Sequence, residues 1–159
     1  MKALILAGGQ GQRLRPYTTV VPKPLMPLGD KPVLEVLLRQ LHAHGIREVV
    51  IAVNHLRELI EAFFNDGRAL GLKITYSVED EPLGTAGPIG AVLDELGNDF
   101  LVLNGDLLTT LDFARLITAH ETSRAAATVA IYRQQLRLDY GIITRDGDNR
   151  LTDYVEKPM

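Results

Sequence analysis

Three glycines and an arginine stand close together near the start of the chain, directly after a short apolar run. The run Lys-Ala-Leu-Ile-Leu at residues 2–6 breaks into Gly8, Gly9 and Gly11, and Arg13 follows two residues later. Glycines let backbone N–H groups approach a ligand because no Cβ stands in the way, and consecutive N–H groups form a concave anion site. A buried strand that leads into a glycine-rich, cationic loop therefore predicts a phosphate-binding site.

Two familiar phosphate-binding motifs do not fit this loop. A dinucleotide-binding turn follows the pattern G-x-G-x-x-G, and counted from Gly9 and Gly11 its third glycine position holds Leu14. A Walker A loop places Gly-Lys-Ser/Thr at the start of a helix, whereas the first lysine after this loop is Lys23, between two prolines. A nicotinamide cofactor and a P-loop kinase or ATPase are therefore both disfavoured.

The composition favours one globular domain. The chain has 159 residues, of which 46% are hydrophobic and 23% charged, and we expect residues 1–159 to form a single domain with a core. The formal net charge of -3 argues against a nucleic-acid partner. No apolar run approaches the ~20 residues that cross a bilayer, so no membrane partner is expected either. The sequence contains no cysteine, which removes disulfide and thiolate chemistry, and a cytoplasmic location is the expectation.

Hydrophobic periodicity predicts strands that alternate with helices. The expected strands cover residues 2–6, 48–53, 73–78, 99–103 and 125–132, with two shorter ones at 140–144 and 151–155. The expected helices cover residues 33–41, 56–64, 85–96 and 111–121. Such alternation implies a doubly wound α/β domain with a mostly parallel sheet, because right-handed crossovers place helices on both faces.

The usual strand order of such a sheet brings a carboxylate to the glycine loop. In the order 3-2-1-4 the first strand lies beside the fourth, and ligands bind at the carboxyl ends of these strands. The fourth strand ends in Asn104-Gly105-Asp106, so Asp106 should face the phosphate site across one crevice. The alternative is that Asp106 only caps the turn or the next helix. With Arg13 and Lys23 near the phosphates, we favour Mg2+ on Asp106, because this ion prefers one or two carboxylates plus phosphate oxygens.

Three of the five lysines precede a proline, which holds the preceding residue in an extended conformation. For Lys31 a solvated surface loop is the favoured interpretation, whereas Lys23 and Lys157 are candidate ligands of phosphate. Lys157 follows Glu156 at the end of an expected strand. A carboxylate beside an ammonium suits a sugar phosphate, because the carboxylate accepts from hydroxyls and the ammonium pairs with the phosphate.

The residue types that could support other reactions are absent or poorly placed, which also favours chemistry on phosphate. The two serines, Ser77 and Ser123, lie outside any G-x-S-x-G context, and no cysteine is present, so a protein nucleophile is disfavoured. The four histidines have no partners at metal-binding spacing. Direct displacement at phosphorus remains, and this reaction needs positioned cations more than it needs a protein nucleophile.

An ordered set of motifs resembles a known family. Residues 6–35 read LAGGQGQRLRPYTTVVPKPLMPLGDKPVLE. Four further stretches follow in order: EDEPLGTAGPIGAV at 79–92, FLVLNGD at 100–106, Tyr-Gly at 140–141 and Val-Glu-Lys-Pro at 155–158. This set resembles the signature of the sugar-1-phosphate nucleotidylyltransferases, which join a nucleoside triphosphate to a sugar phosphate. The resemblance covers nearly the whole chain.

The resemblance implies a Rossmann-like nucleotidyltransferase fold and the transfer of a nucleotidyl group to a hexose 1-phosphate with release of pyrophosphate. The residues that it implies as catalytic are Arg13, Lys23 and Asp106, and Asp106 is also the implied ligand of Mg2+. The implied nucleotide-binding residues are Gly8, Gly9, Gly11, Gly84, Thr85 and Ala86. The implied contacts to the sugar phosphate are Asn104, Gly141, Glu156 and Lys157.

The run Glu-Pro-Leu-Gly-Thr-Ala-Gly-Pro at residues 81–88 resembles the mannose-1-phosphate guanylyltransferase branch most, so GTP and mannose 1-phosphate are the preferred substrates. Two alternatives stay open: dTTP or UTP with glucose 1-phosphate, and a non-catalytic module that binds nucleotide sugars or regulates. The chain stops at Met159, whereas the catalytic domain that it resembles continues through a second metal-binding aspartate. We therefore expect a fragment truncated at its C-terminus, weak Mg2+ binding by Asp106 alone, and exposed apolar surface that a homo-oligomer could cover.

Overall fold

A computed structural model of the chain describes residues 1–79, 84–135 and 139–157. They fall into two compact units, Met1–Ala119 and His120–Met159. The first unit contains the parallel sheet and the glycine-rich loop, and the second contains an antiparallel hairpin. A single domain over residues 1–159 stays a prediction.

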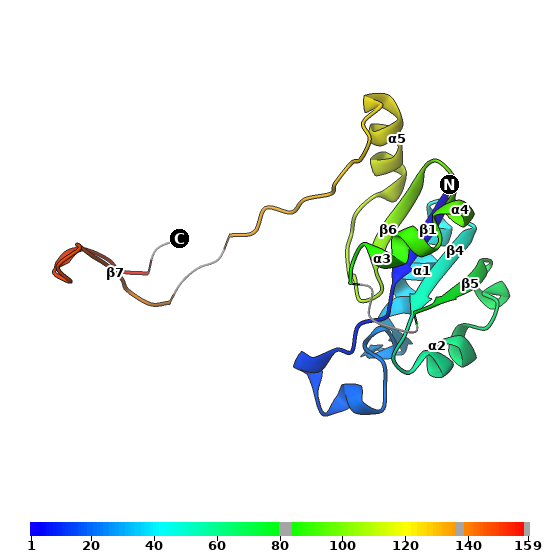
Figure 1. The fold of residues 1–159 in the computed structure, drawn as a ribbon, viewed down its shortest axis with the longest axis horizontal. Helices are drawn as coiled ribbons and strands as arrows, with labels where there is room; N and C mark the ends of the chain where they lie inside the picture. Colours follow the sequence, from blue (N-terminus) through cyan, green and yellow to red (C-terminus); the bar gives the residue numbers. More distant parts are fainter. Residues whose placement is uncertain (80–83, 136–138, 158–159) are drawn as a thin grey trace. The chain divides into compact units, whose positions relative to one another are not determined.

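Four parallel strands form the sheet of the first unit (Figure 1). They are β1 (Lys2–Leu6), β4 (Glu48–Val53), β5 (Lys73–Val78) and β6 (Phe100–Asn104), in the order β5-β4-β1-β6. This is the 3-2-1-4 order expected from the sequence, so the predicted α/β fold is confirmed. The register pairs Leu6 of β1 with Asn104 of β6, and the carboxyl ends of these two strands therefore meet at one edge of the sheet.

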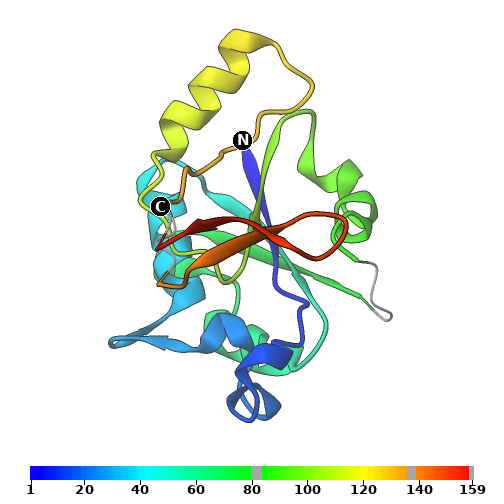
Figure 2. The same ribbon diagram turned by 90° about the vertical axis from the view of Figure 1, so that its left-hand side faces the viewer.

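Alternate residues of β1 face two hydrophobic clusters, one on each side of the sheet. Ala3 and Ile5 pack in the larger cluster with side chains of α1 (Val33–Ala43) and α2 (Arg57–Phe64) and with Phe113, the first residue of α5 (Phe113–Ser123). Leu4 packs on the other face with Val92 and Leu96, which flank or belong to α3 (Gly87–Ala91) and α4 (Leu93–Leu96). Figure 2 shows the cyan α1 and the green α3 and α4 on opposite sides of the strands.

The segment between β1 and α1 consists of short elements. Three 3-10 helices, η1 (Gln12–Leu14), η2 (Tyr17–Thr19) and η3 (Lys23–Leu25), precede a small antiparallel pair formed by β2 (Pro27–Leu28) and β3 (Lys31–Pro32). A fourth 3-10 helix, η4 (Arg68–Leu70), precedes β5. Short turns of this kind suit a segment with four prolines between residues 16 and 27, because proline removes the backbone donor that a longer helix needs.

The prediction of one helix over residues 85–96 is wrong in one respect, because the structure has two short helices there, α3 and α4. Val92 separates the two helices with φ -119°, outside the helical range. Gly87 and Gly90 fall within five residues of each other in α3, and glycine lowers helix stability by about 1 kcal/mol relative to alanine. Low intrinsic propensity therefore accounts for the break.

The second unit contains β7 (Ile142–Arg145) and β8 (Leu151–Val155) in an antiparallel pair. These agree with the two short strands expected from the sequence, although β7 begins two residues later. The carboxylate Oδ1 of Asp146 closes the turn by accepting from the N–H groups of Asp148 and Arg150, both at 2.9 Å.

The strand expected over residues 125–132 is absent from the described residues, and this prediction is wrong. The segment has the apolar and β-branched residues of a strand, but a strand also needs a neighbour to complete its backbone hydrogen bonds. Within the second unit, the described strands β7 and β8 pair with each other, so neither provides this neighbour.

In the described part of the chain, no helix is both long enough and apolar enough to cross a membrane.

Two cross-strand neighbours test how the second face of the sheet contributes to stability. Leu4 is fully buried whereas its partner Val102 is 41% exposed. We expect Leu4→Ala to lower the free energy of unfolding by about 2–5 kcal/mol, because it leaves a cavity in the core. The matched change Val102→Ala should cost less than about 1 kcal/mol, the span of strand propensity. Urea unfolding measures both, and equal losses would contradict the described packing.

Candidate functional site

A pocket of about 870 Å3 lies at the carboxyl ends of the strands in the first unit. The glycine loop after β1 forms one part of its wall and the turn after β6 another. Lys23, Pro24, the residues directly after β4 and β5, and the start of the α3 region also line it. Ligands of open α/β sheets bind at this edge, where the strand order reverses.

Gly11 is the most constrained residue of the glycine loop. Its φ of 59° lies in the left-handed region, which favours glycine. A Cβ at this position would lie 2.9 Å from Cγ2 of Thr18 and 3.3 Å from Cβ of Lys23. The hydroxyl of Thr18, a buried residue, donates to the carbonyl of Gly11 at 2.9 Å. Backbone conformation, space and hydrogen bonding therefore all select glycine here.

Gly8 and Gly9 differ in their surroundings. A Cβ on Gly8 would lie 3.2 Å from Oε1 of Glu79 and 3.4 Å from Cβ of Asn54, so the loop passes close to the ends of β4 and β5. A Cβ on Gly9 would meet nothing within 4 Å, and this residue is exposed. The loop is thus closely supported at Gly8 and Gly11, and it is open at Gly9.

The turn after β6 brings Asp106 to the pocket. The N–H of Gly105 donates to the carbonyl of Leu6 at 2.8 Å, which continues the pairing of β6 with β1 by one residue. A Cβ on Gly105 would lie 3.2 Å from Cβ of Ala7 and 3.3 Å from the carbonyl oxygen of Leu6. The two strand ends approach closely because residue 105 has no side chain, and Asp106 follows directly.

Lys23 forms an ion pair with Asp106 across this pocket. Lys23 stands between Pro22 and Pro24, which are both buried, and the carbonyl of Pro22 accepts from the N–H of Leu25 at 2.8 Å. The side chains of Lys23 and Asp106 are 41% and 33% exposed. Both charged groups can therefore reach a bound anion or cation while their backbones are held by the fold.

Most of the site residues predicted from the sequence meet in this pocket. Its lining includes the predicted residues Gly8, Gly9, Gly11, Arg13, Lys23, Gly84, Thr85, Asn104 and Asp106. Ala86 precedes α3 and does not line the pocket. Residues 80–83 of the predicted motif at 79–92 lie outside the described residues. The structure brings these groups together, while their individual roles stay predictions.

Gly141, Glu156 and Lys157 belong to the second unit. The hydroxyl of Tyr154 forms a hydrogen bond with the carboxylate of Glu156, and a Cβ on Gly141 would lie 2.6 Å from that same hydroxyl. Lys157 has a left-handed backbone with φ 45°. Their predicted contact with a sugar phosphate stays a prediction.

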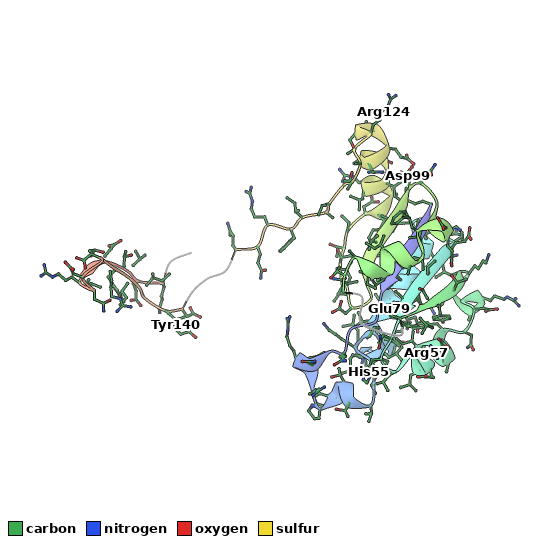
Figure 3. The ribbon with its side chains drawn as sticks, viewed as in Figure 1. His55, Arg57, Glu79, Asp99, Arg124 and Tyr140 are labelled. Atoms are coloured by element: carbon green, nitrogen blue, oxygen red, sulfur yellow. The ribbon has the colours of Figure 1, made fainter. Side chains whose placement is uncertain are left out.

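Asn54 and Glu79 are among the pocket residues that were not predicted as site residues. The amide Nδ2 of Asn54 donates to the backbone carbonyl of Glu79 at 2.8 Å, and the N–H of Glu79 donates to the carbonyl of Val53 at 3.0 Å. Figure 3 labels Glu79 where β5 ends. Their positions directly after β4 and β5 were the available signal, because all parallel strands of one sheet end at the same edge.

The pocket offers few ligands for a metal ion. Within the described ranges, no group of three or more histidine, aspartate or glutamate side chains lies close enough to hold one. Asp106 supplies the carboxylate that pairs with Lys23, and Glu79 lines the same pocket. Mg2+ keeps several waters and binds through one or two carboxylates plus phosphate oxygens, so these residues fit an ion that shares its coordination with a phosphate ligand.

A parallel sheet, a supported glycine loop and a pocket lined by Arg13, Lys23 and Asp106 define an α/β domain of the Rossmann-like class. The comparison with known proteins is more specific. The chain belongs to the nucleotidyl transferase family, whose sequence pattern matches residues 2–159.

The relatives of the chain include enzymes for different bases. A mannose-1-phosphate guanylyltransferase of Mycobacterium tuberculosis is 40% identical over 156 residues, covering 98% of this chain and 44% of that protein. A UTP–glucose-1-phosphate uridylyltransferase of Synechocystis is 37% identical over 172 residues, which cover 99% of this chain and 44% of that protein. A structure of HddC from Yersinia pseudotuberculosis with GMP-PN has a TM-score of 0.68 and 25% identity, and the match covers 99% of this chain and 70% of that one. The chain thus spans less than half the length of the curated relatives it matches.

Gly11 provides a test of how the loop is supported. We expect Gly11→Ala to lower the free energy of unfolding by about 1–3 kcal/mol, because alanine is strained at positive φ. Gly9→Ala is the matched control and should change it by less than about 0.5 kcal/mol, since its Cβ would meet no atom within 4 Å. Thermal or urea unfolding measures both.

The double variant Gly11→Ala with Thr18→Ser separates crowding from backbone strain. Serine removes the methyl group that the new Cβ would meet and keeps the hydroxyl that donates to residue 11. It should recover part of the lost stability. If Gly9→Ala and Gly11→Ala were equally destabilising, the described support of the loop would be wrong.

Proposed function

We propose that the protein transfers a nucleotidyl group from a nucleoside triphosphate to a hexose 1-phosphate, giving a nucleotide sugar and pyrophosphate. The observation that carries this proposal is the pocket in which the glycine loop lies together with Lys23 and its partner Asp106. Membership of the nucleotidyl transferase family supports it. An oxygen of the sugar phosphate attacks the α-phosphorus in line with the departing pyrophosphate.

The residues of the pocket divide the work on the phosphates. Backbone N–H groups at Gly8, Gly9 and Gly11 bind the triphosphate, together with the guanidinium of Arg13. Lys23 neutralises charge near the reacting phosphorus. Fixed cations and N–H dipoles stabilise the charge that spreads over the transferring group, which is the main catalytic requirement of phosphoryl and nucleotidyl transfer.

Asp106 would hold Mg2+, which supplies charge neutralisation to the phosphates when it is bound. The lack of a preformed ligand cage among the described residues fits an ion that is shared with the nucleotide. Asp106 orients that ion from the turn after β6, which the close approach of Gly105 to β1 holds in place.

GTP is the preferred nucleotide. Gly84, Thr85 and Ala86 are assigned to the nucleoside, and Gly84 and Thr85 line the pocket. The resemblance of residues 81–88 to the guanylyltransferase branch supports GTP, and so does the 40% identity to the guanylyltransferase of Mycobacterium tuberculosis.

Mannose 1-phosphate is the preferred acceptor. Asn104 lines the pocket next to Asp106 and can hydrogen-bond with sugar hydroxyls. We assign Gly141, Glu156 and Lys157 to the sugar phosphate as well, on the resemblance of their motifs. A homo-oligomer and a cytoplasmic location remain predictions.

A second pair of substrates is UTP, or dTTP, with glucose 1-phosphate. The observation that favours UTP is the similarity to the Synechocystis uridylyltransferase, which is nearly as high as the similarity to the guanylyltransferase. A module that binds nucleotide sugars without turnover is the third candidate.

Pyrophosphate release tests the reaction directly. The 159-residue chain is incubated with Mg2+ and each of GTP, dTTP, UTP, CTP and ATP, paired with mannose or glucose 1-phosphate. We expect release to be fastest with GTP and mannose 1-phosphate. A faster rate with UTP or dTTP and glucose 1-phosphate would replace the preferred substrates with the second pair.

If no pyrophosphate is released, calorimetry with the same nucleotides shows whether the chain binds them. Nucleotide binding without pyrophosphate release would support the binding module and reject turnover by these residues. Absence of both binding and release would reject the proposed function for this chain.

Arg13 provides a test of the phosphate contacts. Arg13→Ala should weaken GTP binding about 10–100-fold, because it removes a charge-assisted hydrogen bond to phosphate. Arg15→Ala is the matched control: it removes the same charge two residues away, at an exposed residue that does not line the pocket. Calorimetry measures both affinities. If the two variants lost equal affinity, general electrostatic attraction would explain the effect and Arg13 would lose its assigned contact.

A further inference from the structure

The ion pair between Lys23 and Asp106 brings two proposed functional groups into direct contact. The ammonium of Lys23 contacts the same carboxylate that would hold a divalent cation. An ammonium and a metal ion both bind carboxylate oxygens through charge, so they compete for them. The structure therefore contains a cation of the protein's own at the position where a metal ion would bind.

The fold aims Lys23 at this carboxylate. The two buried prolines fix the backbone on both sides of Lys23, and its Cβ lies next to Gly11, where only a glycine leaves enough room. Asp106 is held by the close pairing of Gly105 with the end of β1. Both partners start from fixed backbones, whereas the four-carbon stem of lysine lets the ammonium move between neighbouring anions.

The second cation of the pocket is differently placed. Arg13 also lines the pocket, and it forms no ion pair within the part of the chain that the structure describes. The guanidinium of Arg13 is thus available to a phosphate from the outset, while the ammonium of Lys23 is already paired. The two cations of the site are therefore unequal before any ligand binds.

We propose that Lys23 occupies the cation position at Asp106 in the nucleotide-free protein and excludes divalent ions from it. The phosphates of an arriving nucleotide offer Lys23 a second anion, and its ammonium moves to them and releases the carboxylate. Asp106 then becomes available only when a polyphosphate is present, so a divalent cation enters with the nucleotide and not ahead of it. The exclusion rests on the ion pair, and the release step rests on the proposed function.

The proposal requires the two states to differ in their affinity for ligands. A ligand shifts an equilibrium only by as much as it binds one state better than the other. The nucleotide binds better to the state in which Lys23 faces the phosphates, and a divalent cation binds better to the state in which Asp106 is free. Lys23 thereby links the two ligands through a single side chain.

Binding of Mn2+ to the nucleotide-free chain tests the exclusion. Mn2+ stands in for Mg2+, and the electron paramagnetic resonance signal of the free ion reports the fraction that is bound. We expect Lys23→Met, which removes the ammonium and keeps an unbranched stem, to bind Mn2+ about tenfold more tightly than the unaltered chain, within the range typical of coupled sites. Asp106→Asn should abolish this gain when it is combined with Lys23→Met.

Lys31→Met is the matched control for charge. Lys31 is also paired with a carboxylate, that of Asp30, and neither residue lines the pocket. Lys31→Met changes the net charge by the same amount as Lys23→Met and also frees a carboxylate, but outside the pocket. It should therefore raise the Mn2+ affinity much less than Lys23→Met does. The exclusion is overturned if Lys23→Met and the unaltered chain bind Mn2+ equally, or if the gain persists in the Asp106→Asn background. Circular dichroism confirms that each variant is folded, and Lys23→Gln repeats the test if Lys23→Met is not.

Lysine side-chain NMR tests the release step. The chain has five lysines, so a sample labelled only in lysine gives five Nζ or Cε signals, and the one missing from Lys23→Met belongs to Lys23. We expect metal-free GTP to shift this signal, and Asp106→Asn to shift it without any nucleotide. If GTP binds by calorimetry and leaves the signal unmoved, the release step is wrong. If GTP does not bind, the proposed function fails, while the Mn2+ comparison still decides the exclusion.

Discussion

The close pairing of β6 with β1 at their carboxyl ends is the constraint on which the rest of the pocket depends. One hydrogen bond, from the N–H of Gly105 to the carbonyl of Leu6, extends the parallel ladder beyond the strands themselves. It is possible because Gly105 has no Cβ that would press on Ala7. This contact joins the turn that carries Asp106 to the loop that follows β1, although the two are nearly a hundred residues apart in the sequence.

Charge and packing are combined in the segment between β1 and α1. The buried hydroxyl of Thr18 fixes the loop at Gly11, and Lys23 lies against that same glycine before it reaches Asp106. The apolar and polar contacts are therefore not separate layers. The residues that hold the loop in shape, Gly11 and Thr18, also position the ammonium of Lys23 in the pocket.

The sequence predicts the sheet well because its signals are local. Short apolar runs and abrupt glycine and aspartate ends identify β1 and β6, and the usual connection rules then supply the strand order. Asn54 was not predicted because nothing in its local sequence marks it, and Glu79 begins a motif in which only later residues were assigned to the site; the shared edge of the sheet brings both to the pocket. The strand expected at residues 125–132 failed for the opposite reason: its composition is favourable, but a strand depends on a neighbour that composition does not report.

The packing of the pocket is unevenly distributed. The glycine loop follows the central strand β1, whereas the residues assigned to the nucleoside precede α3, a helix of only five residues. Gly84, Thr85 and Ala86 are exposed, whereas Gly11 lies against the buried Thr18. Changes at the exposed residues therefore displace fewer packed atoms than changes at Gly11, so the contacts to the nucleoside can vary while the loop keeps its shape.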